Sequence, residues 1–366
     1  MGFVFRAVNL AGSTLIFTQD QKPQTGELFR SGAFFCSVET FLKTNNSRYS
    51  LEPIDLSSLS TISLKGRGGK VNTSLFGKPL KGLPGIGGFL EALPHILAAN
   101  GLREVVHAIE SARSANKAIL WGMGGHVIKT GMAPVLAELM ENGFATGFAM
   151  NGSASIHDFE IALVGYTSED VEAVLPDGRF GSAEETGREM NDALGLGRAE
   201  GLGMGESLGR KLDSIADPAF AQSSLLVRAY RSNVPVTVHV AVGTDTPHTH
   251  PAADGANIGA TTHHDFRLFS SLVTELNNGG VYINLGSAVV MPEVFLKALS
   301  AVRNLGYVVN EFTTVNLDFL QHYRPKFNVL ERPHAGGAGG RGYGLTGHHE
   351  IMLPLLAALL LNPVNE

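Results

Sequence analysis

Short apolar runs alternate with amphipathic stretches along most of this chain. The apolar runs have the length of buried strands, and they predict strands over 118–121, 144–150, 234–242, 281–285 and 307–315. The stretches between them space their apolar residues three and four apart, which is typical of helices packed on a core. They predict helices over 85–113, 132–140, 182–194, 223–230, 264–276 and 292–304. This alternation favours an α/β fold with a mostly parallel sheet and helices on both faces.

The two ends of the chain depart from this pattern. Residues 1–50 hold the polar, turn-rich runs TQDQKPQTGE and KTNNSRYS and predict a weakly structured N-terminal extension. Residues 51–84 predict an irregular approach segment, and residues 85–366 predict a single α/β domain. The last apolar run, 351–361, is too short to span a bilayer and predicts a buried C-terminal helix.

The composition narrows the class of protein and its partners. Of the 366 residues, 44% are hydrophobic and 17% are charged, which is typical of a soluble globular protein. The formal net charge of -6 argues against a nucleic-acid partner, which usually requires a basic face. The single cysteine, Cys36, excludes an internal disulfide and fits a reducing compartment. Residues 3–17 mix polar with apolar positions, so no signal peptide is predicted. We therefore expect a cytoplasmic protein that binds neither nucleic acid nor membrane.

A glycine turn follows the first predicted strand and supplies the first candidate site. Gly122, Gly124 and Gly125 precede His126, and a helix is predicted to begin just beyond them. Glycines let a ligand approach the backbone, and a helix N-terminus favours an anion. The spacing differs from the G-x-G-x-x-G of dinucleotide-binding loops, so a structural turn and a nucleotide loop both remain open.

Polar residues also follow the second strand. Asn151 and Gly152 come directly after the apolar run, with His157 and Asp158 a few residues later. Ligands bind at the carboxyl ends of strands in parallel α/β sheets, which favours a functional role. Acidic residues are also common at the start of a helix, so a structural role is the alternative.

The stretch 244–265 has the highest density of histidine and carboxylate. Asp245, His248, His250 and Asp254 fit an active-site loop in which histidine acts as acid, base or hydrogen-bond partner. A metal site using His248, His250 and Asp254 is the alternative, although no H-x-x-x-H spacing or cysteine partner supports it. A solvated loop is the third possibility.

Two further glycine-containing loops complete the set of candidates. Gly286 and Ser287 follow a predicted strand and precede a helix that contains Glu293, so they form another loop at a carboxyl end. Residues 334–350 hold several glycines and Arg341, and they predict either a phosphate-binding loop or a flexible loop.

From about residue 117 to residue 360, the order of these motifs resembles the deoxyhypusine synthase family. The strand and glycine turn of 122–127 and the segment 151–158 are similar to its first two signatures. The run SLLVRAYRSNVPVTV, 224–238, is similar to a helix and strand of the family, and 354–357 is similar to its closing helix.

This resemblance implies a Rossmann-like fold, bound NAD and a homo-oligomer, since the family forms tetramers with sites at subunit interfaces. The family moves an aminobutyl group from spermidine to a lysine through an enzyme-lysine imine. The residues that we expect near NAD are Gly124, Gly125, His126, Asn151, Gly152, His157, Asp158, Gly286 and Ser287. Those that we expect to act on substrate and protons are Asp245, His248, His250, Asp254 and Glu293.

The chain departs from the family at its reactive lysine. Met291 stands in that position, with Pro292 and Glu293 where the family has two histidines. A thioether cannot form an imine, so we do not expect a true deoxyhypusine synthase. The leading hypothesis is an NAD-dependent enzyme, with no metal, that oxidises a small amine-bearing substrate to an imine. The alternatives are a metal-dependent hydrolase or lyase and a non-catalytic nucleotide-binding relative.

Overall fold

The structure is a computed structural model that describes residues 48–83 and 85–362. The chain divides into one unit that ends at Gly68 and a second that begins at Gly69. The described part of the first unit, residues 48–68, is exposed and contains the short helix α1 (Leu64–Arg67). The predicted N-terminal extension lies outside the described residues except for its last three positions, and the predicted domain boundaries stay predictions.

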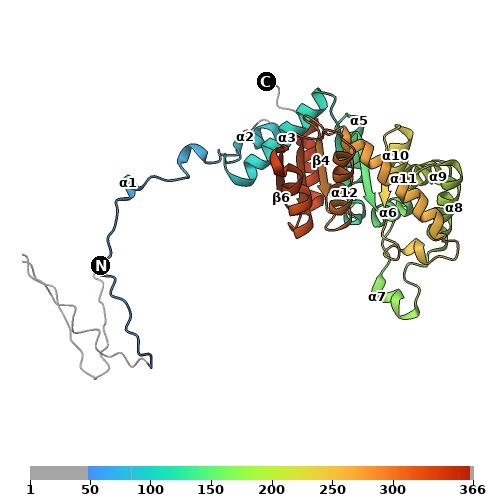
Figure 1. The fold of residues 1–366 in the computed structure, drawn as a ribbon, viewed down its shortest axis with the longest axis horizontal. Helices are drawn as coiled ribbons and strands as arrows, with labels where there is room; N and C mark the ends of the chain where they lie inside the picture. The colour runs from blue at the N-terminus through green and yellow to red at the C-terminus, as the bar shows by residue number, and fades with distance from the viewer. Residues whose placement is uncertain (1–47, 84, 363–366) are drawn as a thin grey trace, which may run out of the picture. The chain divides into compact units, whose positions relative to one another are not determined.

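The second unit is built on a parallel sheet of six strands (Figure 1). In chain order they are β1 (Ile119–Met123), β2 (Gly147–Asn151), β3 (Val236–His239), β4 (Val281–Leu285), β5 (Thr313–Asp318) and β6 (Arg341–Thr346). Their order across the sheet is β3-β2-β1-β4-β5-β6, and every neighbouring pair is parallel. All six strands therefore end at one edge, which we call the carboxyl edge.

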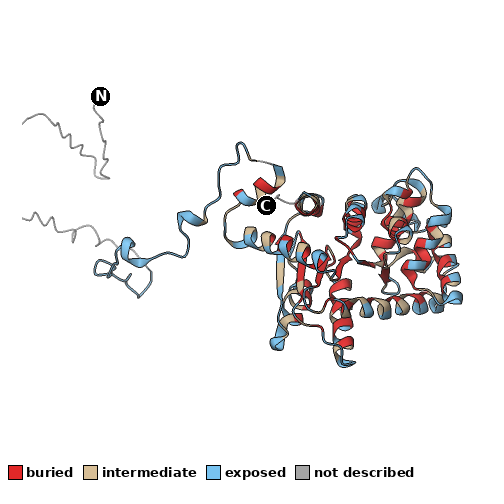
Figure 2. Ribbon diagram, turned by 90° about the horizontal axis from the view of Figure 1, so that it is seen from above, coloured by how far each residue is buried: buried red, intermediate tan, exposed pale blue. Residues whose placement is uncertain are grey.

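Helices cover both faces of this sheet, and the predicted α/β fold is confirmed. Two clusters of buried hydrophobic side chains form the core, and successive residues of β1 alternate between them. Trp121 belongs to the larger cluster and packs with α5, whereas Leu120 belongs to the smaller one and packs with α11 and α12. The helices of the second unit are α2 (Gly85–Ala92), α3 (Leu97–Ser114), α4 (Gly125–Lys129), α5 (Ala133–Glu141), α6 (Gly152–Val164), α7 (Val171–Val174), α8 (Glu184–Glu200), α9 (Met204–Ile215), α10 (Leu225–Arg231), α11 (Gly255–Thr274), α12 (Val290–Asn304) and α13 (His349–Leu361). Figure 2 shows that the buried residues gather on the strands and on the helix faces turned toward them.

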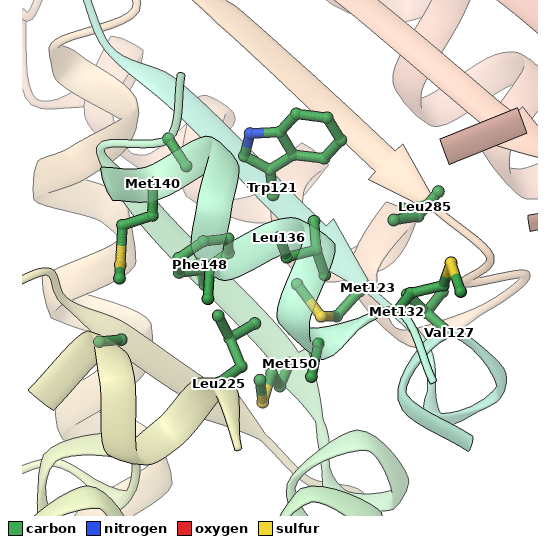
Figure 3. Close-up of a cluster of buried hydrophobic side chains, with 14 of the residues drawn as sticks. Trp121, Met123, Val127, Met132, Leu136, Met140, Phe148, Met150, Leu225 and Leu285 are labelled. Atoms are coloured by element: carbon green, nitrogen blue, oxygen red, sulfur yellow. The ribbon is translucent and has the colours of Figure 1, made fainter. Parts of the chain in front are cut away.

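The larger cluster holds β1 and β2 in place beneath α5. Trp121 and Phe148 lie side by side under Leu136 and Met140 (Figure 3), and both aromatic side chains are buried. The Trp121 Nε1–H donates to the Phe144 carbonyl oxygen at 2.9 Å, so the only polar atom of the indole is satisfied. This packing fixes the ends of β1 and β2, and both strands lead into candidate loops.

Two predicted helix boundaries are wrong, one beside glycines and one at a proline. The helix predicted over 182–194 continues as α8 to Glu200, and α9 follows it at Met204–Ile215. Gly197 lies against the Ser207 hydroxyl, so the glycine allows α8 and α9 to pack closely. The predicted helix 85–113 is divided into α2 and α3 around Pro94.

One predicted strand and one predicted loop also need correction. The strand predicted over 307–315 lies at Thr313–Asp318, because Tyr307 and Val308 are exposed residues of the connection before it. The glycine-rich stretch 334–350 contains β6, an edge strand, in place of a phosphate-binding loop. Its Gly342 lies against the Leu330 backbone, where a Cβ would come within 2.3 Å of the carbonyl oxygen.

The described helices include none with both the length and the apolar character needed to cross a bilayer. The C-terminal run that the sequence assigns to a buried helix forms α13, and its Leu353, Leu356 and Leu360 lie in the larger core cluster.

A buried carboxylate fastens the start of α9 to β3. Asp265 is a completely buried residue of α11, and its Oδ2 accepts from the backbone N–H groups of Val238 at 2.7 Å and Gly205 at 2.8 Å. The Asp265 Oδ1 has no hydrogen-bond partner. The nearest side chain that could carry a positive charge is that of His264, whose Nδ1 lies 4.0 Å from this oxygen. Burial raises the pKa of Asp265 to about 7, against the backbone hydrogen bonds that lower it.

We predict that Asp265→Asn removes a pH-dependent loss of stability. The pKa is higher in the folded protein than in the unfolded chain, so the stability contributed by protonated Asp265 is lost as pH rises toward 7. The free energy of unfolding of the variant, relative to the wild type, should rise by roughly 2 to 4 kcal/mol between about pH 4.5 and 8. Urea unfolding at both pH values measures it. Asp254→Asn replaces one exposed helix cap by another and should show no such trend. The prediction would be contradicted if the difference in unfolding free energy between Asp265→Asn and the wild type were the same at both pH values.

Candidate functional site

The candidate site lies along the carboxyl edge, where the loops after the six strands gather. The sheet order changes direction between β1 and β4, because β2 and β3 follow β1 on one side while β5 and β6 follow β4 on the other. Open parallel sheets bind ligands in the crevice at such a switch point. The loops on either side of it contain Gly124 and Gly286.

Gly124 and Gly286 bring these two loops into backbone contact. A Cβ on Gly124 would lie 2.3 Å from the Gly286 carbonyl oxygen, a distance that no side chain tolerates. Gly286 has a φ of +62°, in the left-handed region that favours glycine. The Gly124 N–H donates to the Leu285 carbonyl at 3.1 Å, and the Gly286 N–H donates to Leu317 at the same distance. The sheet pairing therefore continues into the loops and fixes them.

Similar close contacts link the remaining loops along the edge. A Cβ on Gly125 would lie 2.2 Å from the Ser153 Oγ, at the start of α6. A Cβ on Gly152 would lie 2.0 Å from the Asp245 Oδ2, in the loop after β3. A continuous set of contacts therefore runs from the β4 loop through the β1 and β2 loops to the β3 loop.

The half of the edge over β2 and β3 has one unsatisfied acidic oxygen. Asn151 caps α6 by accepting from the Ala154 N–H at 2.9 Å. The Asp245 Oδ2 is buried without a hydrogen-bond partner, and burial raises the pKa of this carboxyl while His248 opposes the shift. A small, mostly apolar cavity lies beside them, lined by residues that include Ser155, Ile156, Asn191 and Met204. His248 borders this cavity, and its Nδ1 accepts from the Gly243 N–H at 3.2 Å.

The half over β4, β5 and β6 carries a group of rings around one carboxylate. His349 begins α13, is 1% exposed, and neither of its ring nitrogens has a hydrogen-bond partner. Its Nε2 lies 3.6 Å from the Asp318 Oδ1. The ring centroids of His126 and Phe319 lie 5.6 and 5.8 Å from that of His349. Burial lowers the pKa of His349, and the Asp318 carboxylate opposes that shift.

Two residues predicted for the cofactor point away from this edge. Asp158 is completely buried and accepts from the Ser224 hydroxyl at 2.6 Å and from the Leu225 and Leu226 N–H groups at 2.8 Å. It therefore holds the start of α10, and burial raises its pKa to about 6. The His157 Nδ1 lies 2.7 Å from the Thr167 hydroxyl, in the segment that follows α6. Both carry structural contacts instead of facing the crevice.

Three residues predicted for catalysis are likewise engaged elsewhere. His250 lies 3.2 Å from the Glu184 Oε2 at the start of α8, and Asp254 caps α11 by accepting from the Ala256 N–H at 2.6 Å. Glu293 pairs with Lys297 and Arg324 and accepts from the Asn328 amide. Of the five predicted catalytic residues, only Asp245 and His248 border the loops of the carboxyl edge.

The described residues contain no group of three or more His, Cys, Asp or Glu side chains placed to hold a metal ion. The residues of the alternative metal site are not grouped, because His250 and Asp254 have the separate partners given above. Met291 is completely buried under the sheet with Tyr282 and Phe295, so its position does not face the crevice. The Ser287 hydroxyl accepts from the Met291 N–H at 3.1 Å and is used to start α12.

Asp318, Phe319 and His349 were not identified from the sequence. Asp318 was missed because the predicted fifth strand ended three residues too early, at residue 315. His349 is not predicted because the glycines of β6 predict a loop. Without that strand, the pattern does not place the histidines that follow it at the carboxyl edge. The available signal was the HHE run directly before a strongly apolar helix.

No protein-family model matches this chain, and no curated protein matches it. Solved structures with a similar backbone include a proposed LOR/SDH protein from Methanococcus maripaludis S2. It is 16% identical with a TM-score of 0.44, and the match covers 73% of this chain and 70% of that one. A proposed deoxyhypusine synthase from Entamoeba histolytica is 11% identical with a TM-score of 0.45, covering 75% and 90%.

A third similar structure is AgrE in a ternary complex with ornithine and NAD+. It is 15% identical with a TM-score of 0.44, and the match covers 71% of this chain and 32% of AgrE. This chain therefore spans about a third of the length of AgrE. One of the three similar structures bears the name of the family that the sequence motifs resemble.

We predict that Gly124→Ala destabilises the protein because the new methyl group forces the β1 and β4 loops apart. Overpacking of this kind costs about 1 to 3 kcal/mol, which chemical unfolding measures. Gly259→Ala is the matched control, since a Cβ there meets nothing within 4 Å on α11 and should raise stability by up to about 1 kcal/mol. Equal stability of the two variants would contradict the contact at the switch point.

Proposed function

We propose that this protein binds NAD along the carboxyl edge and oxidises a small amine-bearing substrate to an imine. The observation that carries the proposal is the strand order β3-β2-β1-β4-β5-β6, in which every neighbouring pair is parallel. A sheet of this order binds a dinucleotide across its switch point, with one nucleotide on each half.

The residues at the edge fit the parts of NAD. The glycine turn of Gly124 and Gly125 permits close approach of a pyrophosphate to the backbone, and the first turn of α6 adds N–H groups. The Asp245 Oδ2 lacks a partner, and a ribose hydroxyl would supply the missing donor. Acidic side chains take this role on the first half of such sheets, so we place adenosine over β1, β2 and β3.

The nicotinamide end then lies over β4, β5 and β6, beside His126, Asp318 and His349. When bound, NAD supplies an acceptor for the hydride that amine oxidation releases. The carboxylate of Asp318 is nearly completely buried there and favours a cationic substrate group. An amine-bearing substrate is also what the resemblance to deoxyhypusine synthases implies. Because Met291 takes the place of the family's lysine, the product imine would leave the site without transfer to an enzyme lysine.

The resemblance further implies a homo-oligomer, and this stays a prediction, as does the cytoplasmic location. A non-catalytic relative that binds NAD would share the same edge. Calorimetry together with a turnover assay separates the two, because a binding protein would saturate with NAD+ without reducing it in the presence of polyamines or basic amino acids.

We predict that His126→Ala weakens NAD+ binding at least tenfold, a loss of about 1.4 kcal/mol. His126 is exposed at the first turn after Gly125, so its removal should leave the fold unchanged. His263→Ala removes an exposed histidine in the middle of α11 and serves as the control. Titration calorimetry measures both affinities. Absence of NAD+ binding by the wild type, or equal affinities for the wild type and His126→Ala, would contradict the proposal.

A further inference from the structure

His349 is a buried histidine whose hydrogen-bonding groups are unused. Its side chain is 1% exposed, yet neither ring nitrogen has a hydrogen-bond partner. A buried polar group without a partner destabilises the folded state, so proteins rarely keep one without a use. The pyrophosphate and ribose contacts proposed for NAD do not use it, because they come from the Gly124 and Gly125 turn, the first turn of α6 and Asp245.

The Nε2 edge of this ring faces the switch point. A Cβ on Gly286 would lie 2.7 Å from Nε2 and 2.8 Å from Cε1, so the glycine is what lets this edge reach the β4 loop. The Asp318 Oδ1 lies 3.6 Å from the same nitrogen and accepts from the Phe319 N–H at 2.8 Å, which fixes the carboxylate. The His349 Nε2, which can accept a proton, and the negatively charged Asp318 carboxylate therefore lie next to each other beside the switch point.

The side chains that shield His349 from solvent are themselves exposed or partly exposed. The rings of His126 and Phe319 pack edge-on against the His349 ring. His126 is exposed and Phe319 is 42% exposed. Phe319 also stacks on the exposed ring of His348, with centroids 6.0 Å apart. Exposed side chains change rotamer on a fast timescale, so movement of Phe319 would open a path to Nε2.

We propose that His349 accepts a proton from the ammonium group of the substrate and that Asp318 compensates the charge that results. This inference rests on the proposed function. An N–H bond of the ammonium group breaks, the proton goes to Nε2, and the electron pair stays on the substrate nitrogen. That electron pair is the one that a carbon–nitrogen double bond requires. The imidazolium formed lies beside Asp318, as in the histidine–carboxylate pairs of general-base catalysis.

The electrostatic surroundings of His349 agree with this role. The charged and titratable groups that act on it are Asp318 from the end of β5, His126 from α4 and Glu350 from its own helix. Burial and His126 lower its pKa, and Asp318, Glu350 and the Leu317 backbone oppose that change. The net lowering of the pKa favours the neutral ring, which is the form that accepts a proton.

The test uses the full chain as the wild type, His349→Gln, Asp318→Asn and the control His348→Gln. NAD+ affinity is measured first by calorimetry and should agree within about twofold among all four proteins. The imidazole nitrogens are then followed by NMR between about pH 5 and 9 in 15N-histidine-labelled, NAD+-loaded protein. The signal lost in His349→Gln assigns His349.

We expect Asp318→Asn to lower the titration midpoint of His349, because a carboxylate stabilises the imidazolium. Addition of 1,4-diaminobutane, spermidine or L-lysine should lower the wild-type midpoint as well, since a bound ammonium repels the imidazolium. A histidine with only a structural role would not respond to the amine. With the amine that responds, His349→Gln should reduce kcat at least about 100-fold and abolish the acid limb of the pH profile. His348→Gln should change neither result.

The outcomes separate the two proposals. A wild type that binds no NAD+ overturns the proposed function and this inference with it. If NAD+ binds but the titration midpoint of His349 is unchanged by Asp318→Asn and by all three amines, the inference alone is overturned. If His349→Gln does not fold, the Asp318→Asn and amine titrations decide the question on proteins that retain the histidine.

Discussion

The contact between the loops after β1 and β4 is the constraint on which the rest of this structure depends. Gly124 lies against the Gly286 carbonyl at a distance that excludes even a methyl group. The strands behind these glycines are the central pair of the sheet, so their positions are set by buried packing on both faces. Because the two loops cannot separate without breaking that pairing, their relative position at the switch point is fixed.

The central strands could be predicted from the sequence because they are buried on both faces. β1, β2 and β4 are continuous apolar runs, and each was placed to within three residues at either end. β6 could not be predicted in this way, because Gly342 and Gly344 replace the apolar residues that mark a strand. The physical reason appears only in the fold, where Leu330 and Gln321 occupy the space that side chains would need. A glycine in sequence does not distinguish a loop from a place of close packing.

The candidate site was only partly predictable for a different reason. Carboxylates that start helices and carboxylates that face ligands both follow strands and loops, so they look alike in sequence. Asp158 and Asp254 prove to hold the starts of α10 and α11, whereas Asp245 keeps an oxygen without a partner. The distinction depends on which N–H groups lie nearby, and these come from residues such as Leu225, distant in the chain.

The unsatisfied polar atoms give the two halves of the carboxyl edge different chemical characters. On the β2–β3 half the unpaired group is an acceptor, the Asp245 Oδ2, and a hydroxyl would satisfy it. On the β4–β6 half the unpaired groups include the imidazole of His349, which can both donate and accept. A ligand that spans the crevice would meet an acceptor at one end and a proton-transfer group at the other. The same asymmetry argues that chemistry belongs beside β5 and β6, because the histidines of the 244–265 stretch lie on the opposite half and His250 is already paired.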